Sequence, residues 1–332
     1  MKSITEAQYD QLCDACDALL QQSSSFERKA NTWLHVIREH PIFLQAYGAV
    51  FFDTNRGFFF SLLKQFLWHI TVGGYKLIHS IYRNYILGDR LIKEHKAFEN
   101  LFVSHFLNET FMDHEKDFYF FDLPSKMTQD PSTSLQLYIN FTGLSSRTIR
   151  QRWKNKIVPS NALPRYLPLF SELKLRGLMF VEAIAILREK TTSSFQKRIK
   201  FQAAIACLSS SSHSNYRLAF QIQHYVKNNQ VKRIFTTYEG HPWERLIFAF
   251  ARKVNPRVDC IGYQHALVFR KQHAIRRKLE ALYEPNFILC SGEHGMQQFQ
   301  ALDYLPTDRL ILFGSNRTAP IKREKLAVGL LN

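Results

Sequence analysis

The second half of the chain alternates between short β-branched or aromatic runs and helical patterns, and this alternation restricts the fold most strongly. Strands separated by helical segments form right-handed βαβ units, in which helices cover both faces of a parallel sheet. We expect an α/β protein with a Rossmann-like parallel sheet. Its last four strands should lie near 231–237, 258–263, 286–290 and 309–313, with helices at 242–254 and 293–302.

The part of the chain before residue 98 carries only helical patterns. We expect a second helix at 26–39 and a long aromatic-rich helical stretch at 58–96, interrupted at Gly73 and Gly74. These residues should pack as a separate helical layer. We divide the chain into a helical amino-terminal region (1–97), a Rossmann-like domain (98–320) and a truncated tail or start of a linker (321–332).

Between residues 98 and 230 the patterns are mixed. Two β-rich runs, at 101–106 and 135–141, predict the first strands of the sheet, and 118–121 is a weaker strand candidate. A serine-rich stretch at 209–214 predicts a solvated loop that caps the next helix. Helical patterns occupy 145–156, 168–189, 194–209 and 214–228.

The chain is strongly basic, with 44 Lys and Arg against 28 Asp and Glu, a net charge of +16. This charge favours polyanions: nucleic acid, an anionic membrane face or phosphorylated substrates. A nucleic-acid partner is disfavoured, because the basic residues are dispersed and no helix-turn-helix, RNP or zinc pattern occurs. Five cysteines without framework spacing predict buried thiols in a reducing compartment.

No secretory signal pattern opens the chain, and no uninterrupted apolar span of about 20 residues could cross a bilayer. We therefore expect a cytoplasmic protein. Aromatic residues in the helical region, among them Phe60 and Trp68, lie beside Lys64 and Lys76. They indicate either a buried core or contact with the anionic surface of a membrane.

The segment 233–245 carries the densest chemistry. A strand pattern stops at Glu239, Gly240 follows, and a helical pattern begins after His241. Ligands bind where the carboxyl end of a strand meets the amino end of a helix, because free N–H groups converge there. We expect Glu239, His241, Glu244 and Arg245 to face a ligand. The alternative is an ordinary turn with surface charges near the helix dipole.

Two other strand ends repeat this arrangement, and a third histidine ends the first strand. Since the carboxyl ends of parallel strands share one edge of a sheet, these residues should face one cleft. Neither a P-loop nor a dinucleotide fingerprint is present, although a serine-glycine pair could hold phosphate at a helix start. The additional candidates are His105, Gln264, His265, Ser291 and Gly292.

A dense basic run follows the strand that ends near His265. It is either a solvated helix face or an anion-binding flap over the cleft. The run comprises Arg270, Lys271, Arg276, Arg277 and Lys278.

The order of these short motifs resembles bacterial surface-carbohydrate biosynthesis proteins, the capsule and lipopolysaccharide glycosyltransferases of the two-Rossmann GT-B type. The similarity covers about residues 98–317. Its motifs are Tyr238-Glu239, Pro242-Trp243-Glu244-Arg245, Gly262-Tyr263-Gln264-His265, Ser291-Gly292 and Phe313-Gly314-Ser315.

The resemblance implies transfer of sugar from a nucleotide-activated donor to a saccharide or lipid-linked acceptor at the cytoplasmic face of the inner membrane. It implies an acceptor-type amino-terminal half, with the nucleotide sugar as co-substrate and neither metal nor cofactor. A second Rossmann domain would be expected after the first. The chain stops at Asn332, so we expect an amino-terminal or truncated half, or a relative whose second Rossmann domain comes from a partner chain.

Within this interpretation Glu239 is the general base, and His265 shares the catalytic centre with it. Related sialyl-type transferases carry two acidic residues before the glycine, whereas Tyr238 takes the first place here. His241, His265 and Arg245 would stabilise negative charge on acceptor or leaving phosphate. Two alternatives stay open: a non-catalytic single-Rossmann assembly partner, and a basic nucleic-acid-binding protein.

Overall fold

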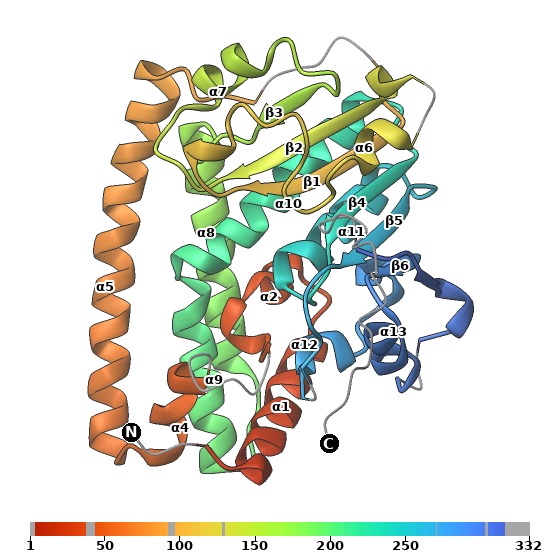
Figure 1. The fold of residues 1–332 in the computed structure, drawn as a ribbon. Coiled ribbons are helices and arrows are strands. Elements are labelled where there is room, and N and C mark those ends of the chain that lie inside the picture. Colours follow the sequence, from red (N-terminus) through yellow and green to blue (C-terminus); the bar gives the residue numbers. More distant parts are fainter. Residues whose placement is uncertain are drawn as a thin grey trace, which may run out of the picture.

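The computed structural model describes residues 4–37, 44–91, 97–127, 130–269, 271–302 and 305–315. Its centre is one sheet of seven strands, and every pair of neighbouring strands is parallel (Figure 1). The strands are β1 (Asn100–Phe106), β2 (Ser134–Asn140), β3 (Ser160–Ala162), β4 (Arg233–Thr237), β5 (Asp259–Gln264), β6 (Phe287–Cys290) and β7 (Leu310–Leu312).

Helices cover the sheet, and the predicted Rossmann-like α/β fold is confirmed. The early helices are α1 (Glu6–Gln21), α2 (Phe26–Ala30), α4 (Gly48–Phe52), α5 (Asn55–Ile81), α6 (Leu123–Lys126) and α7 (Ser146–Trp153). The later ones are α8 (Leu169–Arg188), α9 (Ser194–Cys207), α10 (Ser210–Asn228), α11 (Pro242–Val254), α12 (His273–Arg276) and α13 (Glu293–Gln300). Short 3-10 turns, including η1 (Thr32–Leu34), and one π-helical segment, η3 (Tyr82–Ile86), complete the described elements.

The order of the strands is β3-β2-β1-β4-β5-β6-β7. The chain moves outward from β1 to β3 in one direction and from β4 to β7 in the other. The order therefore reverses between β1 and β4. In open α/β sheets the crevice at such a reversal, beyond the carboxyl ends of the strands, is where ligands bind.

All six predicted strands are present and parallel, but the sequence did not predict β3. This edge strand has only three residues, Ser160, Asn161 and Ala162, and no β-branched or aromatic side chain. The predicted strand at 118–121 is wrong. Asp117 Oδ1 accepts the backbone N–H groups of Tyr119 and Phe120, and the segment forms a turn with only an isolated bridge.

Three helix predictions need correction. α2 ends at Ala30 rather than near residue 39, because Asn31 caps the following turn by accepting the N–H of Trp33. α5 continues through Gly73 and packs on α8 and α9. The serine-rich stretch is the first turn of α10, which Ser209 caps through the N–H of Ser212.

The main hydrophobic core lies on one face of the sheet. Leu101 and Ile234 of the strands share it with Tyr9 and Phe58 of the amino-terminal helices and with α9, α10 and α11. The expectation of a separate helical layer is therefore wrong, while the domain boundaries stay a prediction. A smaller core on the opposite face joins Phe102 and other strand residues to Phe120, Leu123 and the segment around α6.

The five cysteines are buried free thiols, as the sequence predicted. No helix in the described ranges is long and apolar enough to cross a bilayer.

Candidate functional site

Four of the predicted site residues meet at the carboxyl edge of the sheet, where the strand order reverses. Glu239 follows β4 and lies between two imidazoles. Its Oε2 atom is 3.4 Å from Nε2 of His241, and its Oε1 atom is 3.7 Å from Nε2 of His265, which follows β5. His105 ends β1, and its pKa responds to the charges of all three. The structure thus brings together four residues that the sequence placed at one edge of the sheet, while their roles stay a prediction.

A tight turn positions Glu239 and His241. Gly240 has a φ angle of +82°, which a side chain rarely allows. A Cβ atom there would also lie 2.5 Å from the backbone carbon of Ala274, so the turn is closed by direct backbone contact. The turn therefore requires glycine for two independent reasons.

Aromatic rings hold the histidines in place. The ring of Tyr119 lies 4.7 Å from that of His265 and 5.4 Å from that of His105, measured between centroids. Trp243 meets His105 edge-on at 5.2 Å. The pKa of His105 is lowered to about 4, chiefly by burial and also by positive charge on His241 and His265, against the opposing effect of Glu239. His105 is therefore neutral at neutral pH.

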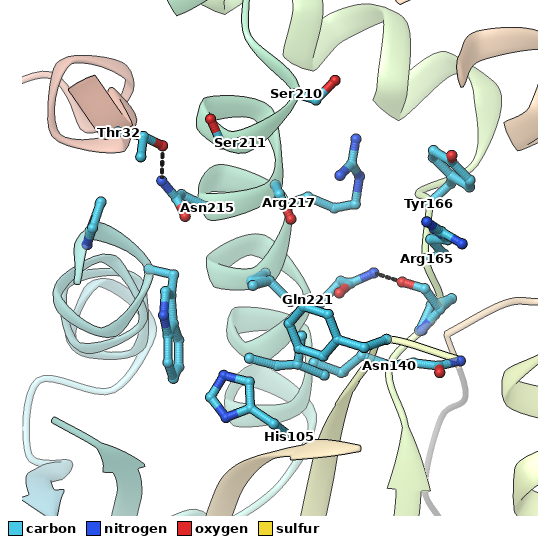
Figure 2. A pocket seen from close by; sticks show the side chains of 18 of the residues that line it. Thr32, His105, Asn140, Arg165, Tyr166, Ser210, Ser211, Asn215, Arg217 and Gln221 are labelled. Atoms are coloured by element: carbon cyan, nitrogen blue, oxygen red, sulfur yellow. Dashed lines mark hydrogen bonds between the residues drawn. The ribbon is translucent and has the colours of Figure 1, made fainter. Parts of the chain in front are cut away.

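A pocket of about 370 Å³ opens beside the cluster. Figure 2 shows His105 at one end, Ser210 and Ser211 of α10 at the other, and Arg165 with Arg217 between them. His241 and Trp243 also line it, whereas Glu239 and His265 do not. His241 is therefore the member of the Glu239 pair that faces the pocket.

The pocket wall is positively charged. Lys76 of α5, Arg165 and Arg217 line it, and none of its described lining residues is acidic. Buried Glu172 neutralises Arg217 through contacts of 2.5 and 2.9 Å. Burial lowers the pKa of Lys76, and the positive charges of Arg217, Arg165 and the neighbouring Arg176 lower it further. An anion in the pocket would relieve this repulsion.

Glu244 and Arg245 do not reach the pocket, which corrects their prediction as substrate-binding residues. Both are fully buried. Glu244 accepts the backbone N–H groups of Glu239 and His241 at 3.0 and 2.8 Å and so caps α11. Arg245 contacts Glu284 at 2.5 Å and donates to the carbonyl of Ala274. Because helix α11 points these side chains into the core, they support the turn.

Gln264, Ser291 and Gly292 form a second group, separate from the pocket lining. Gln264 Oε1 accepts the backbone N–H of Ser291 at 3.2 Å and lies 3.3 Å from its hydroxyl, while the Gln264 amide donates to the carbonyl of Ala266. Gly295 admits this side chain, since a Cβ atom there would lie 2.5 Å from Gln264 Oε1. These contacts link β5 to the start of α13, and they give Gln264 a structural role.

The basic run after β5 is partly anchored to the amino-terminal helix, although its last residue, Lys278, is exposed. Arg277 is buried and contacts Asp17 of α1 at 3.2 Å and His35 at 2.7 Å. Lys271 pairs with Asp10 at 3.2 Å. These residues attach the run to α1. Arg270 lies outside the described residues.

Several pocket residues were not predicted from the sequence. Lys76 lies on a helix far from the strand ends, Arg217 lies in the second turn of α10, and Arg165 follows β3. Trp243 of α11 is half-buried in the pocket wall. Of these residues, only Trp243 could have been assigned to the site from the sequence, because it directly follows the Glu239–Pro242 turn.

Within the described ranges, no group of three or more His, Cys, Asp or Glu side chains is arranged to hold a metal ion. Comparisons with models of protein families, with curated proteins and with solved structures found no match to this chain. The function must therefore be argued from the arrangement of these residues.

Proposed function

We propose that the protein is a glycosyltransferase of bacterial surface polysaccharide biosynthesis. It would transfer sugar from a nucleotide-activated donor to a saccharide or lipid-linked acceptor. The observation that carries the proposal is the contact of Glu239 with two imidazoles, one of which lines a cationic pocket where the strand order reverses. The arrangement supports the proposal because a general base is needed beside the site that holds the acceptor hydroxyl.

The Glu239–His241 pair supplies the proton chemistry in this proposal. Because His241 rather than Glu239 lines the pocket, His241 would take the proton in place of Glu239. The acceptor oxygen would attack the anomeric carbon of the donor sugar as the bond from that carbon to the nucleotide phosphate breaks, and the nucleotide would leave with the bonding electrons. Glu239, 3.4 Å away, would stabilise the resulting imidazolium, as a carboxylate does when it orients a catalytic histidine.

The charge of the pocket suggests the chemical class of the acceptor. Lys76 and Arg165 provide positive charge that no described acidic lining residue balances, and Asn140 and Ser214 add polar groups. An acceptor saccharide that bears a carboxylate or phosphate would fit this wall. We place the reaction at the cytoplasmic face of the inner membrane, where lipid-linked acceptors are held.

A transfer assay tests the function. The purified chain is incubated with a panel of nucleotide sugars and with lipid-linked or free anionic saccharides, with and without a candidate partner chain carrying a second Rossmann domain. We expect transfer by the wild type and a loss of at least about 100-fold in Glu239→Gln, because general base catalysis contributes that much and His241 would need the Glu239 carboxylate to stabilise its imidazolium. Glu293→Gln, an exposed carboxylate at the start of α13, is the matched control and should keep full activity.

The outcomes separate the alternatives. Transfer that survives in Glu239→Gln would show that the Glu239–His241 pair does not supply the proton chemistry and would leave the turn as scaffold. No transfer by the wild type under any combination would contradict the proposal and favour a non-catalytic assembly partner. Binding to random duplex DNA that weakens steeply with salt would instead favour the nucleic-acid alternative.

A further inference from the structure

The outer face of α5 carries many exposed apolar side chains, with Arg56 and Lys64 among them. Six of its large side chains have between 54% and 71% of their surface exposed: Phe60, Leu63, Leu67, Trp68, Tyr75 and Ile78. At 100° per residue they fall within about 140° of the helix circumference. They therefore form one continuous stripe, which we call the α5 face. Single exposed apolar residues are ordinary, but a stripe of this length indicates a binding surface.

The charges around this face have one sign. From Thr54 to Gly88 the chain contains no acidic residue, while Arg56 and Lys64 are exposed on α5. The neighbouring helix α8 carries exposed Lys174, and its two glutamates are buried in ion pairs, Glu172 with Arg217 and Glu182 with Arg28. The region thus combines apolar side chains with unopposed positive charge.

The shape of the region suits a flat partner. α5 has 27 residues, about 40 Å of helix, and it stands along the outer edge of the molecule (Figure 1). Its apolar side chains project from this edge. Trp68 and Tyr75 combine an apolar ring with a polar N–H or O–H group, as residues at membrane–water interfaces do.

We propose that the α5 face binds the surface of an anionic lipid bilayer, with the helix lying in the plane of the interface. The apolar side chains would enter the boundary between head groups and acyl chains, and the basic residues would attract the lipid phosphates. On its opposite side α5 places Lys76 in the wall of the pocket. The membrane contact and the proposed acceptor site would therefore share one helix.

Vesicle co-sedimentation tests this proposal without any measurement of transfer, so its failure is distinguishable from failure of the proposed function. The full chain is mixed with vesicles of phosphatidylcholine alone or with phosphatidylglycerol. We expect binding to the anionic vesicles that weakens with salt. Phe60→Gln/Ile78→Gln should lower the partition coefficient at least about tenfold, because two inserted side chains are lost.

The matched control is Ile157→Gln/Leu267→Gln, which changes two comparably exposed residues outside α5, at 67% and 83% exposure. It should bind as the wild type does, and thermal unfolding should be similar for all three proteins. Absence of wild-type binding, or equal binding by Phe60→Gln/Ile78→Gln, would overturn the proposal. The proposal would also be overturned if vesicles bind neither the wild type nor this variant, and light scattering shows a wild-type dimer that the variant dissociates. In that case the α5 face would join two copies of the chain.

Discussion

Glu244 is a fully buried carboxylate that holds the junction between β4 and α11. Its pKa is raised from an ordinary value near 4.5 to about 7, chiefly by burial and also by the charge of Glu239, against the opposing effects of His241 and two backbone N–H groups. Glu239, five residues earlier, instead lies at the surface of the site against His241 and His265. Glu239 and Glu244 therefore have different roles, although they are the same residue type and lie five positions apart.

The raised pKa of Glu244 predicts a pH dependence of stability. Between about pH 4.5 and 7 the folded protein keeps a proton on Glu244 that the unfolded chain releases, so this group makes stability fall as pH rises. As pH rises across this window, the wild type should therefore lose about 3 kcal/mol of unfolding free energy relative to Glu244→Gln. Urea unfolding at a series of pH values measures it. A difference that does not change with pH would contradict the shifted pKa.

Arg245 offers a second test at the scale of single residues. Replacing it with Met leaves Glu284 as a buried carboxylate without its closest cation, so Arg245→Met should cost about 3–5 kcal/mol of stability. Adding Glu284→Gln should recover part of that loss. A double-mutant cycle by chemical denaturation measures the coupling. Additive losses would show that the two side chains do not act as a pair.

The element that creates the site is the turn from β4 to α11. Its geometry depends on Gly240, whose φ angle is +82° and whose Cα faces the backbone of Ala274. The turn places Glu239 and His241 on one side and sends Glu244 and Arg245 into the core. The sequence signals for a strand end and for a helix start therefore mark the site correctly, but they do not say which of its polar residues face outward.

Gly240→Ala should be strongly destabilising, by about 2 kcal/mol or more, because the new Cβ would clash with backbone in a conformation that alanine disfavours. Gly143→Ala is the matched control. No atom in the described part of the chain lies within 4 Å of its added Cβ, so the change should stay within about 0.5 kcal/mol. Thermal unfolding compares them. Equal stability of the two variants would show that the turn tolerates a side chain.

At the scale of the whole molecule, the sheet and the residues at its carboxyl edge were predictable from sequence. Parallel strands bring their ends together by necessity, so His105, Glu239 and His265 could be grouped without coordinates. The pocket could not be predicted from the sequence. Lys76 and Arg217 reach it because α5 packs against α10, and contact between helices so far apart in the sequence leaves no local pattern.

The central claim is that Glu239 and His241 act as a pair at the pocket. Its most direct test compares the transfer rates of Glu239→Gln, His241→Gln and the double variant with the rate of the wild type. If the two side chains act as one unit, the double variant should be hardly slower than the slower single variant, because groups that act together are not additive. Circular dichroism should show that all three keep the fold. Independent losses that multiply, or full activity in His241→Gln, would contradict a Glu239–His241 pair at the pocket.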